Sequence, residues 1–169
     1  MHGRICVCGR LFRPGRRRGR CGNGNTGCRR EIVPEVPYTA ADLDYSDSDS
    51  RANREQNDPD ARPAIAGEIG DFGEYDRVFI GHPIWWGDAP RIVQTFLEAY
   101  SFEGKTVYTF STSASSSGGG AYGGLRSAYP EINFAGNLHF TSSQLSSAQT
   151  RVRESVSYTH LRAHETLRH

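Results

Sequence analysis

Strand-like and helix-like patterns of hydrophobic residues begin to alternate at about residue 30. Arg77–Gly81 (RVFIG) is a nearly continuous apolar run, which is typical of a central parallel strand covered on both faces. Thr106–Ser111 (TVYTFS) is β-branched and aromatic and predicts a second central strand. Between them Asp88 offers an N-cap and Pro90 suits a first turn. Helical spacing then places one apolar stripe at Ile92, Val93, Phe96, Leu97 and Tyr100.

Weaker patterns complete the series of elements. Short strands are predicted at Glu31–Val33, which Pro34 closes, and at Ile132–Phe140, with an interruption near Gly136. Helices are predicted at Pro63–Ile69, from Tyr122 to the residue before Pro130, and at Ser146–Val156. Thr39–Arg62 is polar and rich in Asp, Ser and Asn, which predicts a long surface excursion with one helical turn at Ala40–Leu43.

Strands that alternate with helices indicate an α/β fold with a doubly wound parallel sheet. Right-handed crossovers place every strand-to-helix loop at one edge of such a sheet, where ligands bind. Two loops, His82–Ala89 and Ser111–Gly120, should therefore meet at the carboxyl ends of the two central strands.

Trp85 and Trp86 lie side by side in the first of these loops. Two indole rings opposite a loop of small residues suit a flat, aromatic, partly polar ligand. The alternative is that the two rings cap the core or fill a protein interface. Adjacent residues of an extended loop point in opposite directions, so at least one ring should pack inward. The pattern alone leaves both interpretations open.

Charge divides the chain into unlike parts. Residues 1–30 carry nine arginines and no acidic residue, whereas residues 31–155 carry nine Lys or Arg against eighteen Asp or Glu. Lys105 is the single lysine, which suggests a GC-rich bacterial genome. No apolar run suits a membrane span or a secretory signal. All four cysteines lie within the first 28 residues, so the acidic part is compatible with a reducing cytoplasm.

Several motifs occur in order at the spacing of a known family. "YDRVFIGHPIWWGDAP", followed by "TFLEAYSFEGKTVYTFSTSASSSGGG", resembles the flavodoxin family, in particular its branch with a P-I-W-W loop. "EIVPEVPYTAADLDY" and "SRANREQNDPDARPAIAGEI" are similar to the same branch, so the resemblance covers roughly Glu31 to Ser155. It implies a flavodoxin-like doubly wound parallel sheet of five strands in the order 2-1-3-4-5. It also implies bound FMN and electron transfer at the isoalloxazine ring.

The resemblance also implies which residues contact the cofactor. The first loop would lie along the flavin and comprises Pro83, Ile84, Trp85, Trp86 and Gly87. The second would contact the ring edge and the ribityl chain through backbone and hydroxyl groups, and comprises Ser111, Thr112, Ser113, Ala114 and Ser115. His82 stands where the family usually has tyrosine, so the local hydrogen bonds should differ. No catalytic side chain and no metal ligand is assigned.

Residues 1–30 depart from the family pattern. A flavodoxin starts with an apolar strand, a phosphate loop of the form (S/T)-x-T-G-N-T and a first helix. Here Cys21–Thr26 (CGNGNT) contains G-N-T, but Glu31 follows too soon for a helix. If Thr26 and Gly27 instead end that helix, residues 2–25 are a frame-shifted reading of the correct DNA. The first strand and helix would then be missing, core would be exposed, and any replacement strand should come from residues 4–12.

The other end departs as well. Val156–Thr166 resembles the translation of a transposase sequencing adapter, so residues 156–169 are interpreted as a non-native tail. The domain prediction is therefore an atypical segment at 1–30, a flavodoxin-like domain at 31–155 and this tail. In the rival interpretation, the four N-terminal cysteines bind a zinc ion and the arginine run of residues 16–18 contacts nucleic acid. The cysteine spacing fits no common zinc module, so neither is expected.

These observations favour an FMN-binding electron-transfer protein that serves redox partner proteins. Two alternatives remain: an FMN-dependent NAD(P)H reductase of small quinone-like substrates, and a flavin-free interaction domain that uses the tryptophan loop. The sequence does not distinguish an electron carrier from a flavin-dependent oxidoreductase, and it does not predict an oligomeric state.

Overall fold

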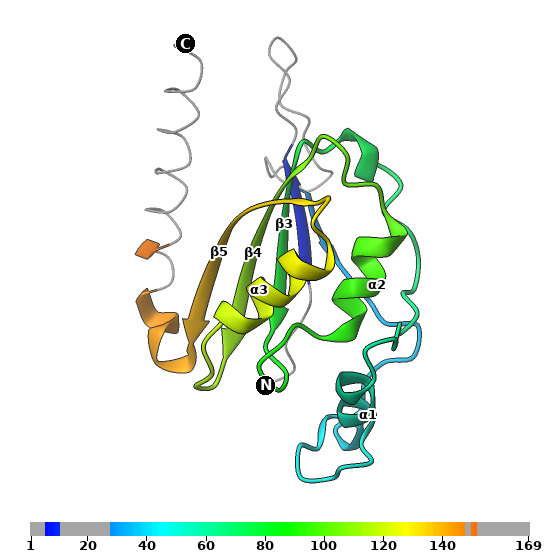
Figure 1. Ribbon diagram of the computed structural model, residues 1–169, viewed down its shortest axis with the longest axis vertical. Coiled ribbons are helices and arrows are strands. Elements are labelled where there is room, and N and C mark those ends of the chain that lie inside the picture. The colour runs from blue at the N-terminus through cyan, green and yellow to red at the C-terminus, as the bar shows by residue number, and fades with distance from the viewer. Residues whose placement is uncertain (1–5, 11–27, 148–149, 152–169) are drawn as a thin grey trace.

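The computed structural model describes residues 6–10, 28–147 and 150–151, and it shows one sheet with helices packed against it (Figure 1). The strands are β1 (Cys6–Arg10), β2 (Cys28–Glu31), β3 (Arg77–Pro83), β4 (Thr106–Ser113) and β5 (Asn133–Thr141), in the order β2-β1-β3-β4-β5. The helices are α1 (Arg51–Asn57), α2 (Arg91–Ala99) and α3 (Gly119–Ala128). Short 3₁₀ turns lie at Ala41–Leu43, Phe72–Glu74 and Ser142–Ser147.

The central strands form the predicted parallel sheet. β3 pairs in parallel with β4, and β4 pairs in parallel with β5. The register shifts where Phe134 and Gly136 of β5 face Val107 and Tyr108 of β4, which leaves Ala135 as a bulge. This bulge is the predicted interruption near Gly136. The α/β class is therefore confirmed, and both strand-to-helix loops lie at one edge, at the bottom of Figure 1.

The prediction of a sheet that is parallel throughout is wrong at β1. This strand lies between β2 and β3, and it runs antiparallel to both. It comes from residues 6–10, within the 4–12 segment from which a replacement strand was expected. A parallel pair needs a crossover, usually a helix packed on the sheet. Beyond Leu11 and Phe12 the connection to β2 is mostly Arg and Gly, with no apolar stripe for such a helix.

Two predicted helical features are wrong, one is confirmed, and one lies largely outside the described residues. Residues 63–69 form no helix; Ile65 makes an antiparallel bridge with Pro34, and Gly67 has a positive φ of 74°. The N-cap of α2 is Pro90 and not Asp88, whose Oδ1 accepts a hydrogen bond from Ala89 N. The turn in the excursion is confirmed at Ala41–Leu43. The predicted last helix at 146–156 lies largely outside the described residues.

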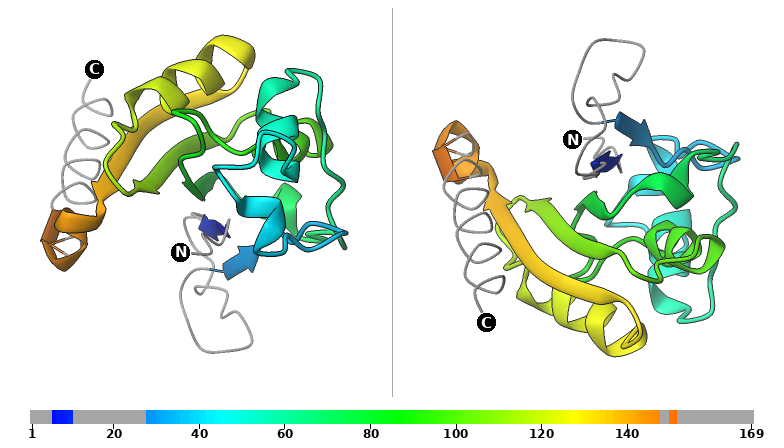
Figure 2. Two further views of the ribbon diagram at one scale, coloured as in Figure 1. Left: turned by 90° about the horizontal axis from the view of Figure 1, so that it is seen from below. Right: turned by 90° about the horizontal axis from the view of Figure 1, so that it is seen from above.

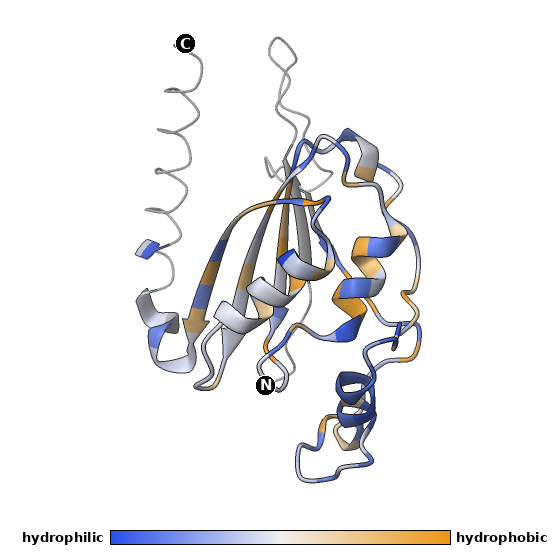
Figure 3. Cartoon of the chain, in the orientation of Figure 1, coloured by the Kyte–Doolittle hydropathy of each residue, from blue (hydrophilic) through white to orange (hydrophobic). Residues whose placement is uncertain are grey.

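The helix α1 was missed because it has no apolar stripe. Its sequence, RANREQN, is polar on almost every side, and Figure 3 draws it as the most hydrophilic helix of the described chain. Apolar periodicity therefore could not reveal it. No helix in the described residues is long and apolar enough to cross a membrane.

The core lies between the sheet and the helices α2 and α3, which cover the same face (Figures 1 and 2). Val78, Ile80 and Val107 are fully buried there. The opposite face is aromatic: Phe79 stacks on Tyr108 with ring centroids 5.2 Å apart, and Phe110 is 37% exposed. Apolar surface is therefore exposed on this face of the sheet.

Candidate functional site

The two predicted loops meet at the carboxyl edge of the sheet. Pro83, the last residue of β3, is in register with Thr112 of β4. The next residue, Ile84, donates its backbone N–H to the Thr112 carbonyl oxygen at 2.9 Å. The parallel register therefore fixes the start of the tryptophan loop (His82–Ala89) against the start of the serine loop (Ser111–Gly120).

A tight turn presents the tryptophans. Trp85 and Asp88 exchange two backbone hydrogen bonds, each of 2.9 Å. The two residues between them have positive φ, 48° for Trp86 and 84° for Gly87, as in a type I′ turn. Trp86 is the one non-glycine residue with positive φ in the described part of the chain. The turn is therefore built at a conformational cost in Trp86.

The two indole rings face different surroundings. Trp85 is 8% exposed and meets the Tyr38 ring edge-to-face, with centroids 5.3 Å apart. Trp86 is 44% exposed and stacks on Tyr45 at 4.2 Å with an interplanar angle of 28°. The prediction that at least one ring packs inward is confirmed, since Trp85 belongs to the core and Trp86 belongs to the surface.

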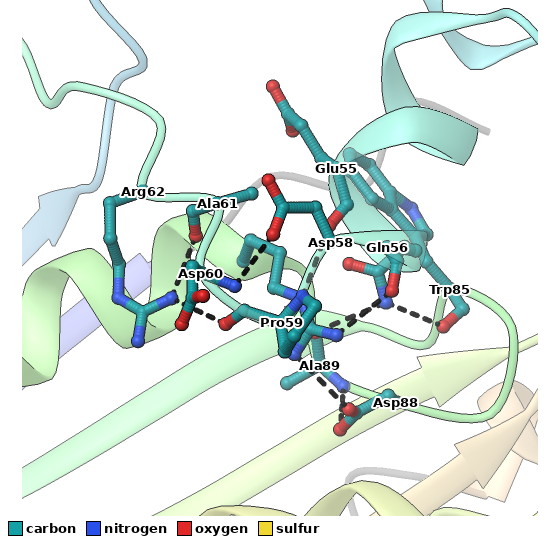
Figure 4. Close-up of polar contacts among 11 residues, drawn as sticks. Glu55, Gln56, Asp58, Pro59, Asp60, Ala61, Arg62, Trp85, Asp88 and Ala89 are labelled. Atoms are coloured by element: carbon teal, nitrogen blue, oxygen red, sulfur yellow. Dashed lines mark hydrogen bonds and ion pairs between the residues drawn. The ribbon is translucent and has the colours of Figure 1, made fainter.

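Helix α1 anchors the polar excursion to the backbone of this turn (Figure 4). Gln56 Nε2 donates to the carbonyl oxygens of Trp85 at 3.1 Å and Ala89 at 3.5 Å. Arg91, at the start of α2, donates to the carbonyl oxygens of Glu55 at 3.2 Å and Gln56 at 2.9 Å. These are carbonyls of the last turn of α1, which have no partner within the helix. The guanidinium therefore joins α1 to α2 beside the tryptophan turn.

A second polar cluster holds Tyr38 against Trp85. The Tyr38 hydroxyl donates to Glu55, which also accepts from Arg51 Nε at 2.7 Å. The Arg51 guanidinium lies 4.1 Å from the centre of the Tyr38 ring. Burial and the adjacent Glu55 carboxylate raise the pKa of Tyr38 above its usual value. Tyr38 therefore stays protonated and keeps donating to Glu55 at neutral pH.

Residues of the serine loop differ in their exposure to solvent. Ser111 is 1% exposed, and its hydroxyl lies 2.9 Å from Nδ1 of His139 on β5. Ser113 is half-buried, and Thr112, Ala114 and Ser115 are exposed. Backbone and small side chains therefore form the accessible part of this loop, while the Ser111 hydroxyl is engaged inside the protein.

His82 ends the buried part of β3. Its Nδ1 lies 2.8 Å from the Pro83 carbonyl oxygen, so Nδ1 carries the proton and donates to it. Burial lowers the pKa of His82 below its ordinary value. The imidazole is thus neutral at pH 7, and it fixes the backbone just before the tryptophan loop.

Glycines let α3 approach the tryptophan turn. A Cβ atom at Gly120 would lie 3.1 Å from the Gly87 carbonyl oxygen, and one at Gly124 would lie 3.4 Å from Asp88 Oδ1. The contact at Gly120 is too close for a larger residue unless the helix or the turn shifts, whereas the contact at Gly124 is an ordinary one. The glycine-rich start of α3 therefore closes one side of the candidate site.

Comparison with known proteins identifies the family of this chain. The flavodoxin family model matches residues 25–156. The chain belongs to the flavodoxin family. A comparison with curated proteins found no match.

Solved structures similar to this flavodoxin-family chain include two from Bacteroides. A protein assigned as a flavoprotein from Bacteroides eggerthii is 45% identical with a TM-score of 0.64, over 72% of this chain and 77% of its own. Another from Bacteroides uniformis is 42% identical with a TM-score of 0.68, over 72% of this chain and 78% of its own. A flavoprotein from Lactobacillus acidophilus, in complex with FMN, is 25% identical with a TM-score of 0.49, over 69% of this chain and 75% of its own.

In this member of the flavodoxin family, the structure brings the ten predicted site residues to one edge of the sheet. Four residues near that edge were not predicted: Tyr38, Tyr45, Gln56 and His139. Tyr45 lies in a polar stretch, and His139 lies on a strand far away in sequence, so no local pattern points to either. In the described residues, no group of three His, Cys, Asp or Glu could hold a metal ion.

Proposed function

We propose that this chain binds FMN at the carboxyl edge of the sheet and acts in electron transfer. The observation that carries the proposal is Trp86, which a strained turn holds outward on a loop that starts beside the serine loop, in a member of the flavodoxin family. A core role does not require this conformation, because Trp85 already fills the inward position. Strain of this kind persists where it serves a site.

The residues present suit the isoalloxazine ring of FMN. Trp86 keeps 44% of its surface exposed with Tyr45 stacked on it, and so offers an aromatic plane. The accessible small residues of the serine loop, Thr112, Ala114 and Ser115, allow a polar ring edge to reach backbone groups. The exposed members of the ten predicted residues would hold the ring and the ribityl chain, namely Trp86, Gly87, Thr112, Ala114 and Ser115. The side chains of Ile84, Trp85 and Ser111 are buried and would support these residues from inside. Bound FMN would supply the redox chemistry, and the protein would supply the aromatic plane and the hydrogen bonds around it.

The loop that would bind the FMN phosphate belongs to the atypical segment of residues 1–30. The candidate phosphate loop, Cys21–Thr26, lies outside the described residues. We further propose that residues before 25 are not native, that residues 156–169 are a tail, and that the native sheet has a parallel first strand with a phosphate loop after it. Support comes from the family match at 25–156 and from the antiparallel β1. On this proposal the present chain binds FMN weakly.

Charge supports a low-potential carrier. Residues 31–155 carry twice as many acidic as basic residues, eighteen against nine. A negative surface disfavours added negative charge nearby, which would lower the reduction potential of a bound cofactor. The same surface suits docking to basic redox partner proteins, and we place the protein in the cytoplasm.

Flavin fluorescence during FMN titration tests the proposal. Two proteins are compared: the present chain, and one whose residues 1–24 are replaced by a flavodoxin start with a phosphate loop. We expect tight binding and quenching by the second protein, and weak binding by the first. Replacing Trp86→Ala in the second should weaken binding about fivefold, since stacking contributes about 1 kcal/mol.

Trp86→Phe is the matched control, because it keeps a planar ring and should lose less affinity than Trp86→Ala. If neither protein binds FMN while both fold, the proposed function is wrong. The tryptophan loop would then be an interaction surface.

A further inference from the structure

One residue outside the predicted site, His139, lies against the serine loop. His139 of β5 is in register with Ser111 of β4, which is in register with His82 of β3. His139 Nδ1 lies 2.9 Å from Ser111 Oγ, and its Nε2 lies 3.2 Å from Ser113 Oγ. Both ring nitrogens are thus engaged with serines at the start of the loop.

The hydrogen bonds of this group have a defined direction. Ser113 Oγ lies 2.6 Å from the carbonyl oxygen of Ser116, which can only accept, so the Ser113 proton is donated there. Ser113 must then accept from His139 Nε2–H. In a neutral imidazole the other nitrogen accepts, so Ser111 donates to His139 Nδ1. Ser111, His139, Ser113 and the Ser116 carbonyl form one continuous chain of donors and acceptors.

Packing holds the far end of the same loop against the imidazole. A Cβ atom at Gly118 would lie 2.5 Å from His139 Cγ, so only glycine lets the ring pack on the backbone there. The segment from Ser113 to Gly118 (SASSSG) has no large apolar side chain and no charge of its own. Segments of this composition are flexible unless other groups hold them. His139 contacts the segment at both ends, and no other strand residue does so among the described contacts.

We propose that His139 is a positioning residue that shapes the serine loop, holding Ala114 and Ser115 where they face the flavin ring edge. The part that concerns the flavin rests on the proposed function. His139 acts through Ser113 and Gly118, and it does not itself contact the ligand.

The test combines two substitutions with a matched control in the full-length chain. His139→Phe keeps a ring against Gly118 but removes both nitrogens, and Ser113→Ala removes the link to the loop. His139→Gln retains an amide N–H that can reach Ser113. Ser117→Ala is the control, because Ser117 is exposed and lies in the same segment.

Amide hydrogen exchange of residues 114–118 in the FMN-free proteins is the first measurement. His139→Phe and Ser113→Ala should each speed exchange about fivefold or more, as loss of one hydrogen bond implies. The double variant should exchange no faster than the faster single variant, because both break the same chain. His139→Gln should restore part of the protection, and Ser117→Ala should leave exchange unchanged.

FMN titration of the same proteins is the second measurement. Dissociation constants should rise about fivefold in the two disruptive variants and stay unchanged in the control. Unchanged exchange in both disruptive variants, or additive effects in the double variant, would overturn the proposal. So would faster exchange with unaltered FMN affinity. If the parent chain binds too weakly to titrate, the same substitutions are made in the protein whose residues 1–24 are replaced by a flavodoxin start. Faster exchange in that protein without FMN binding by its parent would support the loop-shaping role and contradict the proposed function.

If His139→Phe fails to fold, as shown by a lost thermal transition, Ser113→Ala and its control decide the outcome alone.

Discussion

Trp86 occupies a backbone conformation that tryptophan rarely adopts. Its φ of 48° places it at the first central position of a turn that normally takes Gly, Asn or Asp. The cost is on the order of 1 kcal/mol. Trp85, one residue earlier, has an ordinary conformation and is 8% exposed. Two identical side chains in sequence therefore serve different purposes, one in the core and one at the surface.

This difference predicts opposite responses to substitution. Trp85→Ala should lower the free energy of unfolding by about 3–5 kcal/mol, because it leaves a cavity beside Tyr38. Trp86→Gly should change it by less than about 1 kcal/mol, since relief of backbone strain offsets the lost stacking on Tyr45. Urea unfolding followed by circular dichroism measures both. Equal losses in the two variants would show that Trp86 is a core residue.

Helix α1 shows how an element without an apolar stripe is stabilised. Its side chains and its last carbonyls are bound by polar groups from other segments, chiefly Arg91 of α2. Its residue Gln56 in turn binds the backbone on both sides of the tryptophan turn. The excursion and the turn thus stabilise each other through hydrogen bonds and not through apolar burial.

Arg91→Lys should loosen α1 selectively. A lysine keeps the charge but lacks the planar fork that reaches two carbonyls at once. We expect faster amide exchange in α1 and a loss of about 1–2 kcal/mol in unfolding free energy, with α2 still protected. Arg126→Lys on the exposed surface of α3 is the control. Equal amide exchange of α1 in the two variants would show that Arg91 does not anchor this helix.

Among the described residues, helices cover one face of the sheet well and leave the other face poorly covered. Helices α2 and α3 bury the first, whereas Phe110 on the second is 37% exposed above Gly81. The strand between β2 and β3, β1, runs antiparallel to both neighbours. A parallel first strand followed by a crossover helix would cover this face, as other α/β sheets are covered.

Replacing residues 1–24 by a flavodoxin start should therefore bury the aromatic face. We expect a higher midpoint of thermal unfolding and less binding of an apolar fluorescent dye than in the present chain. Phe110→Ser in the present chain is the control, since it should lower dye binding without raising the midpoint. Unchanged dye binding and stability in the replaced chain would contradict the proposal that residues 1–24 are not native.

The local pattern of apolar and polar residues was sufficient to predict β3, α2, β4, α3 and β5, because apolar runs and helical spacing are properties of neighbouring residues. It also placed the tryptophan and serine loops at one edge, since parallel strands leave no other arrangement. It could not reveal the direction of β1, the polar helix α1 or the contacts of Tyr45 and His139. Strand direction, register and side-chain contacts depend on residues far apart in the chain, so only the folded arrangement determines them.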